Sequence, residues 1–192
     1  MESSDEELML EVGKGDETAF ATLVGRFEKR LVSYFYRLGA DRHIAEDCAQ
    51  EVFLRLYRTR TEYEPKARLA TFLFRIARNL WIDHVRSRKP EGKVFSLSGA
   101  PGGDEERETL QARVEADAPK PSAEMRRDDI RREIEEALSF LPEDQRSVFL
   151  LCEVDGMRYG DVAEVLGIPV GTVKSRMHTA VGRLRARLTR KA

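Results

Sequence analysis

The stretch YGDVAEVLGIPVGTVKSRMHTAVGRLRARL, from Tyr159 to Leu188, decides the fold, because it predicts two helices joined by a tight turn. Gly167 follows the first apolar run, where helices commonly end in a left-handed residue, and Pro169 prevents a simple continuation. The chain must therefore change direction between the two helices. This pattern predicts a helix-turn-helix.

Each of the two predicted helices carries one apolar face. These faces consist of Val162, Ala163, Val165 and Leu166 in the first helix, and of Val173, Met177, Ala180, Leu184 and Leu188 in the second. Their spacing of three and four residues is that of an amphipathic helix. We therefore expect one side of each helix to be buried and the remainder to face water.

The residues left for the exposed side of the second helix, and those beyond it, are mostly basic. They are Lys174, Arg176, Arg183, Arg185, Arg187, Arg190 and Lys191, and no acidic residue follows Glu164. Such a surface suits the phosphate backbone of DNA, although it also fits a solvated basic helix packed on its own domain. We favour DNA binding, because the small Ala163 and Gly167 and the apolar Val173 lie where crossing helices approach closely.

The first turns of the second helix of a helix-turn-helix contact base edges in the major groove. The candidates for contact with duplex DNA here are Thr172, Lys174, Ser175, Arg176, His178 and Thr179. Arg176 has an equally open alternative, since it lies beside the Met177 stripe and could hold a phosphate or brace Glu164 of the preceding helix.

The composition agrees with a DNA-binding protein whose charge is segregated. The chain has 192 residues, of which 41% are hydrophobic and 35% charged, and its net charge is -1. This length allows one large domain or two small ones. The basic C-terminal end is balanced by an acidic middle between Asp104 and Asp129.

The cysteines and the N-terminus predict a soluble cytoplasmic protein. Cys48 and Cys152 are far apart and have no neighbouring cysteine, so a small buried residue is a better interpretation than a disulfide scaffold or a zinc ligand. Met1 is followed by acidic and polar residues, and no apolar run reaches membrane-spanning length. We expect no export and no direct insertion into a membrane.

The first 90 residues predict helices only. Ser4 and Glu7 form a capping-box pattern, and Asp16 and Asp41 are expected to cap two further helices. In the helix after Asp41 the residues expected to face inward are Ile44, Ala45, Cys48, Val52 and Leu56, and those expected to face outward are Glu46, Asp47, Gln50, Glu51 and Arg55. Phe53 is out of step with the inward set, and spacing leaves a satellite core contact and an anchor for a partner equally open.

A further helix is predicted over TFLFRIARNLWIDHVRSRK, residues 71 to 89. Basic and amide residues line one side of it, interleaved with aromatics, a combination that suits single-stranded nucleic acid. The alternative is a set of core aromatics beside a solvated helix. We favour that alternative for Phe74 and Trp81.

With both halves in view, the chain resembles the sigma-70 family of bacterial RNA polymerase sigma factors, in particular its small extracytoplasmic-function (ECF) group. The segments GDETAF, AEDCAQEVFLRLY and FLFRIARNLWIDHVRSRK resemble the family's region 2. The segment LPEDQRSVFLLCEVDGMRYGDVAEVLGIPVGTVKSR resembles its region 4. The resemblance covers nearly all of the chain except the middle.

The resemblance implies an all-α protein that binds core RNA polymerase and promoter DNA, with no enzymatic activity of its own and no cofactor. It implies that Asp47, Gln50, Glu51 and Phe53 dock on the polymerase, which decides the ambiguity over Phe53. It also implies that Ile76, Arg78, Asn79, Arg86 and Arg88 belong to the surface that opens and reads the minus-10 element. The C-terminal helix-turn-helix would then read the minus-35 element. An anti-sigma factor is a further expected partner.

Three positions depart from the family pattern. Phe72 stands where the family often has Trp, Asp161 where it often has Glu, and Thr179 where an Arg is common. The first two changes are conservative. Thr179 removes an expected contact to DNA, so the upstream contacts are expected to differ in detail.

The resemblance and the composition together predict two small helical domains joined by a flexible linker. Residues 1–90 would form region 2, residues 91–127 an acidic linker with Gly and Pro, and residues 128–192 region 4. The linker would thread through polymerase channels or act as a solvated tether.

The sequence disfavours two other classes of protein. A stand-alone LuxR-type regulator would share the helix-turn-helix, but such proteins carry an N-terminal domain with strands, whereas residues 1–90 predict helices. An enzyme is disfavoured because His43, His84 and His178 lie in separate elements with no nucleophile or metal-spaced partner. No metal site or catalytic residue is predicted.

Overall fold

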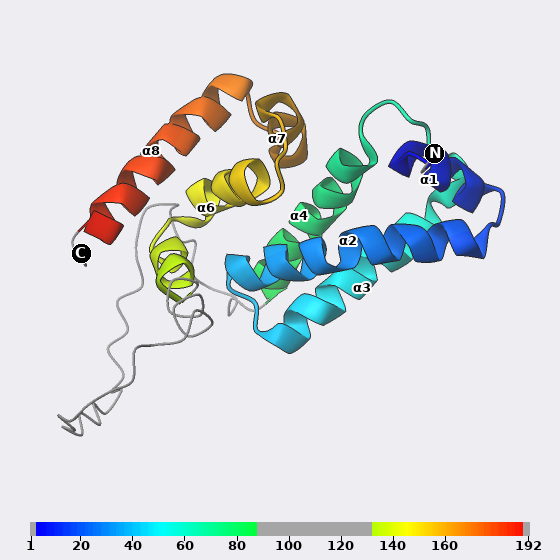
Figure 1. Cartoon of the computed structure of the whole chain (residues 1–192), viewed down its shortest axis with the longest axis horizontal. Helices are drawn as coiled ribbons and strands as arrows, with labels where there is room; N and C mark the ends of the chain where they lie inside the picture. The colour runs from blue at the N-terminus through cyan, green and yellow to red at the C-terminus, as the bar shows by residue number, and fades with distance from the viewer. Residues whose placement is uncertain (1–2, 88–131, 190–192) are drawn as a thin grey trace, which may run out of the picture.

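The computed structural model describes residues 3–87 and 132–189, and all the regular structure in these two ranges is helical (Figure 1). The N-terminal unit contains α1 (Asp5–Gly13), α2 (Glu17–Leu38), α3 (Arg42–Arg58), the short η1 (Arg60–Glu62) and α4 (Leu69–Ser87). The C-terminal unit contains a helix over 132–139, α6 (Glu143–Phe149), the π-helical turn η2 (Leu150–Val154), α7 (Tyr159–Leu166) and α8 (Val170–Thr189). The all-α prediction, with a C-terminal helix-turn-helix, is confirmed. The predicted linker, residues 91–127, lies outside the described residues.

The predicted caps are found at the starts of α1, α2 and α3 and at the end of α7, whereas α4 begins at Leu69, two residues before the predicted start at Thr71. Ser4 and Glu7 form the capping box of α1, and the carboxylates of Asp16 and Asp41 accept backbone N–H groups at the starts of α2 and α3. Gly167 ends α7 in a left-handed conformation with φ of 64°, which a residue with a Cβ atom adopts at a cost. This turn sets the crossing of α7 and α8.

The N-terminal unit is built on α2, which packs against α1 and α3. Its buried side chains recur every three to four residues and include Leu23, Phe27, Leu31 and Phe35. Glu6 of α1 accepts the backbone N–H of Leu69 at 2.8 Å, so α1 caps the first turn of α4.

The C-terminal unit is a small bundle in which α8 packs on α6 and α7. The predicted apolar faces are buried at Val162, Ala163, Val165, Val173, Met177 and Ala180. Leu188 was predicted to continue this stripe, but its side chain is 40% exposed. The prediction was wrong there because α8 extends past the helices that cover its first turns, as Figure 1 shows.

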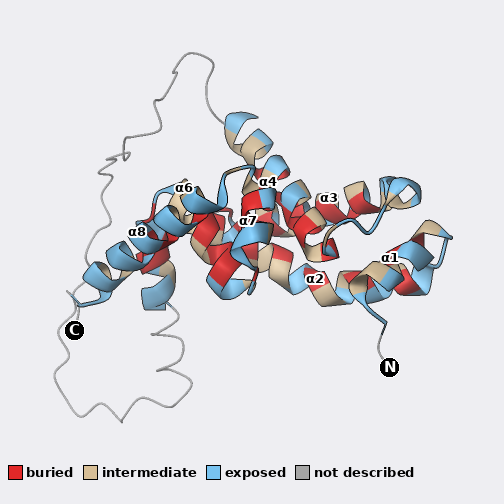
Figure 2. Ribbon diagram, turned by 90° about the horizontal axis from the view of Figure 1, so that it is seen from above, coloured by how far each residue is buried: buried red, intermediate tan, exposed pale blue. Residues whose placement is uncertain are grey.

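The two units contact each other through α4 and α7 (Figure 1). Buried residues run through both units in Figure 2, including the place where α7 lies against α4. None of the helices in the described ranges has the length and apolar character needed to cross a membrane.

Candidate partner and nucleic-acid interfaces

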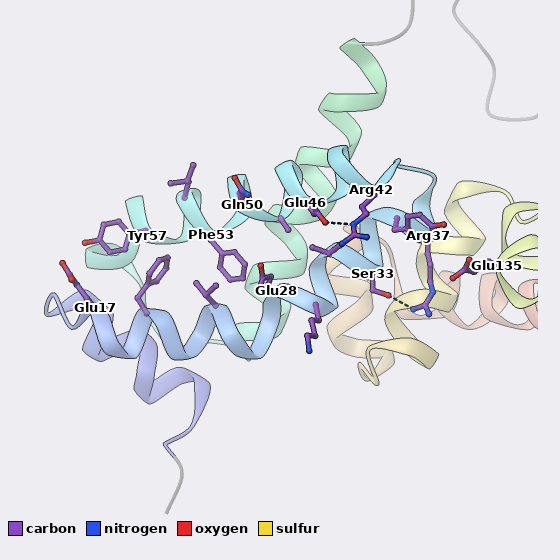
Figure 3. Close-up of a pocket in the computed structure, with 17 residues that line it drawn as sticks. Glu17, Glu28, Ser33, Arg37, Arg42, Glu46, Gln50, Phe53, Tyr57 and Glu135 are labelled. Carbon is purple, nitrogen blue, oxygen red and sulfur yellow. Dashed lines mark hydrogen bonds and ion pairs between the residues drawn. The ribbon is translucent and has the colours of Figure 1, made fainter. Parts of the chain in front are cut away.

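A groove lies between α2 and α3 (Figure 3). Its walls include Phe20, Val24 and Tyr36 of α2 together with Gln50, Phe53 and Leu54 of α3. The groove measures about 1340 Å³. Small-molecule pockets are typically about 300–1,000 Å³ and largely enclosed, so this open groove fits a helix of a partner better.

Phe53 is 7% exposed and meets the ring of Phe20 edge-on, with 6.5 Å between the ring centroids. The core-contact alternative is therefore correct as a description of its packing. One edge of the ring still lines the groove, so this packing does not exclude a contact with a partner.

The other candidate docking residues of α3 lie on a more exposed face. Asp47 and Gln50 are exposed, and Glu51 accepts a hydrogen bond from Arg55 at 2.8 Å. This hydrogen bond lowers the pKa of Glu51. Gln50 also lines the groove, whereas Asp47 and Glu51 lie outside the groove wall.

Leu54 is a groove residue that the sequence analysis missed. Its side chain is 51% exposed, although it lies within an apolar sequence run. The available signal was its position seven residues after Asp47 and four after Gln50, which places all three on one helix face. Leu54 adds to the apolar groove wall that contains Val24 and Phe53, and a contiguous exposed apolar patch is typical of an interaction site.

The candidates on α4 divide between two sides of the helix. Asn79 and Arg86 are exposed, Ile76 is half-buried, and their spacing of three and seven residues places them on one stripe. Arg78 lies on the adjacent side, where its guanidinium donates to Glu143 of α6 at 2.8 Å. Arg88 lies outside the described residues.

Phe74 and Trp81 of α4 are core residues, as the sequence analysis favoured. Phe74 is fully buried and meets Tyr34 edge-on, with ring centroids 5.3 Å apart. Trp81 is 6% exposed and packs on Phe35. Neither ring is free to stack on an unpaired base.

Two aromatic residues near the start of α4, Tyr63 in the preceding loop and Phe72 in the first turn, are half-buried. Tyr63 meets Phe72 edge-on at 5.9 Å, and the guanidinium of Arg75 lies over Phe72 at 5.4 Å. Burial raises the pKa of Tyr63 to about 12, so its hydroxyl stays protonated at neutral pH. A half-buried aromatic next to a cation is the kind of surface on which a base can stack.

The candidates on α8 also divide between two sides. Lys174, Ser175 and His178 are exposed on a stripe that continues through Thr179, whose hydroxyl donates to the carbonyl of Ser175 at 3.0 Å. Thr172 is half-buried beside this stripe. A helix with one basic, solvent-facing stripe over its first turns matches the geometry of major-groove recognition.

Arg176 points to the flank of α8 that faces its own unit. Its Nε pairs with Asp144 of α6 at 3.2 Å. The predicted brace between Arg176 and Glu164 is therefore wrong, because Glu164 pairs with Arg75 of α4 at 3.6 Å instead. Arg176 does brace its unit, but through α6.

The chain offers no evident site for chemistry in its described ranges. No group of three or more His, Cys, Asp or Glu side chains there is placed to bind a metal ion. Cys48 and Cys152 are both buried, and burial raises the pKa of each thiol, to about 11 for Cys152. Both cysteines are therefore unreactive core residues.

Comparison with known proteins matches both units. The sigma-70 region 2 profile matches residues 23–91, and the sigma-70 region 4 profile matches residues 131–184. The ECF RNA polymerase sigma factor SigW of Bacillus subtilis is 33% identical over 188 residues, covering 98% of each chain. The RNA polymerase sigma-H factor of Pseudomonas aeruginosa is 31% identical, covering 93% of this chain and 91% of that one.

Solved structures share the fold. CnrH, solved in complex with the cytosolic domain of CnrY, superposes with a TM-score of 0.71 at 22% identity, covering 99% of this chain and all of that one. RpoE of Bartonella quintana, solved in complex with the anti-sigma factor NepR, gives a TM-score of 0.63 at 22% identity, covering 88% of this chain and 96% of that one.

Proposed function

The chain belongs to the sigma-70 family of RNA polymerase sigma factors, in its ECF group, and from this premise we propose which residues perform each step of transcription initiation. One observation carries the function: the region 2 and region 4 profiles match the two helical units in that order. As a sigma factor the chain is not an enzyme. It binds core RNA polymerase and directs it to promoters. The alternative of a LuxR-type regulator is rejected, because region 2 accounts for the N-terminal unit.

The exposed face of α3 is the proposed docking surface for core polymerase. Asp47, Gln50 and Glu51 supply polar and charged contacts there, and Leu54 with the edge of Phe53 supplies apolar area. A desolvated apolar centre with a polar rim is typical of an interface that binds tightly.

The exposed stripe of α4 is the proposed minus-10 surface. Asn79 offers an amide that can pair with the edge of an unstacked base, and Arg86 a cation for the adjoining phosphate. Ile76 supplies apolar area one turn before Asn79, and Arg78 joins the surface once it is released from Glu143. Arg88 belongs to the same proposed set. Residues 1–90 form region 2 in this proposal.

The exposed stripe of α8 is the proposed minus-35 surface, within residues 128–192 as region 4. Lys174, Ser175 and His178 lie where a recognition helix contacts base edges, with Thr172 and Thr179 at the margins. Residues 91–127 are the proposed linker between the two regions.

An anti-sigma factor is a further proposed partner, and the cytoplasm, where the polymerase works, is the proposed location. The groove between α2 and α3 supports such a partner, because its apolar walls and its open shape suit an amphipathic helix. RpoE of Bartonella quintana, which shares the fold, was solved with an anti-sigma factor.

Run-off transcription tests the function directly. Core polymerase with and without this chain would be given fragmented genomic DNA, and the transcript starts would be sequenced. We expect start sites that depend on the chain and share two upstream sequence elements. Transcription that is identical without the chain would reject the function.

A further inference from the structure

Helix α4 begins without a capping residue of its own. Phe72 donates its backbone N–H to the Arg68 carbonyl at 3.3 Å, so the helical hydrogen bonds begin at Arg68, whose guanidinium cannot accept a hydrogen bond. The first turn of α4 contains no acidic residue. The N–H groups at a helix start have no partner within the helix, and a nearby Ser, Thr, Asp or Asn commonly satisfies one of them. Residues 64–70 include none of these four residue types.

Glu6 of α1 supplies the missing cap from a position 63 residues earlier in the chain. Its Oε1 accepts the backbone N–H of Leu69 at 2.8 Å. Glu6 is half-buried in this contact, and Leu69 is fully buried. The carboxylate also places a negative charge at the positive end of the α4 dipole. The start of α4 is therefore fixed by a residue of another helix.

The opposite end of α1 contacts the start of the connection between α3 and α4. A Cβ atom on Gly13 would lie 2.9 Å from the carbonyl oxygen of Arg60 in η1, so the two backbones touch there. Helix α1 is itself anchored on α2, because Arg26 donates to the Asp5 carboxylate at 2.7 Å. Helix α1 thus contacts residues 60–69, the connecting segment, at both ends, and Figure 1 shows it beside this segment.

The aromatic side chains that could receive a base depend on this connecting segment. Tyr63 lies within the segment and contacts Phe72 in the first turn of α4. The carboxylates of Glu6 and Asp5 lie close enough to the Tyr63 hydroxyl to add to the rise in its pKa that burial causes. Both carboxylates also line one hollow together with residues 65–68. Helix α1 therefore adjoins the middle of the segment as well as its ends.

We propose that α1 is a positioning element for the minus-10 surface and that Glu6 is the residue through which it acts. The bond from Leu69 to Glu6 holds the connecting segment and the first turn of α4 in one arrangement. In that arrangement Tyr63 and Phe72 can stack on an unpaired base without first being ordered, which lowers the entropy cost of binding. The inference rests on the proposed role of α4 at the minus-10 element. It extends the surface to a helix that precedes the residues matched by the region 2 profile, which begin at residue 23.

Hydrogen exchange of the free chain tests the structural step without polymerase or promoter. Glu6→Ala removes the cap, so we expect the amides of Leu69 and Phe72 to exchange roughly tenfold faster as the helix start frays. Glu11→Ala is the matched control, because Glu11 is an exposed carboxylate of the same helix that pairs with Lys14 at 2.7 Å. This control should leave both amides unchanged.

Promoter opening tests the functional step. Each full-length variant is assembled with core polymerase on a promoter found by run-off transcription, and permanganate reactivity is followed over time at saturating enzyme. We expect Glu6→Ala to open the promoter roughly tenfold more slowly than Glu11→Ala. Binding to core polymerase, measured by fluorescence anisotropy, should be the same for both variants, since Glu6 lies outside the α3 face.

A local cap on α4 should replace Glu6. Arg68→Ser places a capping hydroxyl at the start of α4, and Arg68 is exposed, so the fold should tolerate the change. This single variant is the reference for loss of the Arg68 charge. Adding Glu6→Ala to it should slow opening less than about twofold, against roughly tenfold in the wild-type background. An equal loss in both backgrounds would show that Glu6 acts on α1 alone and would overturn the inference.

Two further results would overturn it. Wild-type exchange at Leu69 and Phe72 in Glu6→Ala would show that α1 does not fix the start of α4. Faster exchange with opening as fast as in Glu11→Ala would show that this fixing does not position the minus-10 surface.

The variant Asn79→Ala separates failure of the inference from failure of the proposed function. If Asn79→Ala slows opening and Glu6→Ala does not, the inference is rejected while the minus-10 role of α4 stands. If neither variant slows opening, that role is rejected and the inference with it.

Discussion

Arg176 of α8 and Asp144 of α6 are joined by an ion pair of 3.2 Å on the flank of α8 that faces its own unit. Lys174 and His178, by contrast, lie on the solvent-facing stripe of the same helix. With 3.6 residues per turn, Arg176 lies well round the helix from that stripe. The pair fixes the recognition helix on α6, so we expect Arg176 to position the helix and Lys174 to contact the bases.

Replacing Arg176 with Ala should weaken binding to all upstream sequences about equally. The pair is about two-thirds buried, and a pair of this kind contributes about 0.5–1 kcal/mol, so a similar loss in unfolding free energy is expected. Binding to a library randomised at the upstream element, with thermal unfolding measured in parallel, tests both. A change in preference at one base position would return Arg176 to the set of base-reading residues.

Replacing Lys174 with Ala should change sequence preference and leave the fold intact. Its side chain is exposed in the first turns of α8, so unfolding should be unaffected. A specific base contact discriminates by about 1–3 kcal/mol, whereas a phosphate contact lowers the salt slope by about one unit for every sequence. Selection from a randomised library at two salt concentrations distinguishes a base contact from a phosphate contact. Arg185→Ala, farther along the helix, is the matched control and should give only the salt effect.

Replacing Asp47 and Leu54 with Ala should weaken binding to core polymerase about tenfold or more, because a central apolar contact and a rim charge are lost together. Both side chains are exposed, so helicity and unfolding should be nearly unchanged. Fluorescence anisotropy of the labelled chain with core polymerase measures the affinity. Wild-type affinity in this variant would exclude the exposed face of α3 as the docking surface.

Phe53 is unsuited to the same test. Its ring is 7% exposed and packs on Phe20, so Phe53→Ala should cost about 3 kcal/mol in unfolding free energy whether or not a partner touches it. Comparison of Phe53→Leu with Leu54→Ala is more informative. The first keeps most of the buried volume, and the second removes only exposed area.

The difference between these two residues shows what the sequence could and could not predict. Helix bounds were predictable because caps act locally: Ser4, Asp16, Asp41 and Gly167 each function within one turn. The all-α class and the buried stripes followed from the 3.6-residue period. The neighbours of a side chain that lies off the stripe depend on tertiary packing, so Phe53 and Leu54 could not be assigned from spacing.

The pairing of charges across the two units was equally inaccessible. Arg78 and Glu143 are 65 residues apart in sequence, and no periodicity relates them. The family resemblance indicated which helix carries each role, but not that one side of α4 is covered. That finding required the placement of α6 and α7 against α4.

Replacing Asn79 with Ala should impair promoter opening more than binding to core polymerase. The amide is exposed and has no hydrogen-bond partner among the described residues, so unfolding should be nearly unchanged. Loss of an amide contact to an unstacked base should lower initiation on duplex promoters about tenfold or more. Permanganate footprinting of the melted region checks this. Initiation on a template already mismatched at the minus-10 element should be affected less, and a wild-type footprint on the duplex would contradict the assignment.

Arg30 of α2 donates to the carboxylate of Asp155 in the C-terminal unit at 3.2 Å, so closure of the contact between the two units should depend on pH through Asp155. Burial raises the pKa of this carboxyl from 3.8 to about 6, and Arg30, with Arg37 farther off, opposes the rise only in part. Tyr34 also lies close to it, and burial raises the pKa of its hydroxyl, so Tyr34 stays neutral. The carboxylates of Asp5, Glu6 and Asp161 line the same hollow as Asp155. When the units separate, water reaches Asp155 and its pKa returns toward 3.8. The closed chain therefore binds a proton more tightly, and between about pH 4 and 6 falling pH favours closure while rising pH favours opening.

The pKa shift of Asp155 sets the size of the expected pH effect on the ratio of closed to open chain. A change of one pKa unit corresponds to a tenfold change in an equilibrium, so lowering the pH from about 7 to 5 should raise the ratio of closed to open chain by about tenfold. Energy transfer between dyes attached to cysteines that replace the exposed Lys14 and Ala186, one on each unit, measures this ratio. Asp155→Asn removes the titrating group and should flatten the pH dependence, while Asp161→Asn, at the edge of the same hollow, should leave it in place. A rise in transfer with increasing pH would show that the pair with Arg30 outweighs burial, and Asp155 would then stabilise the closed chain in its ionised form.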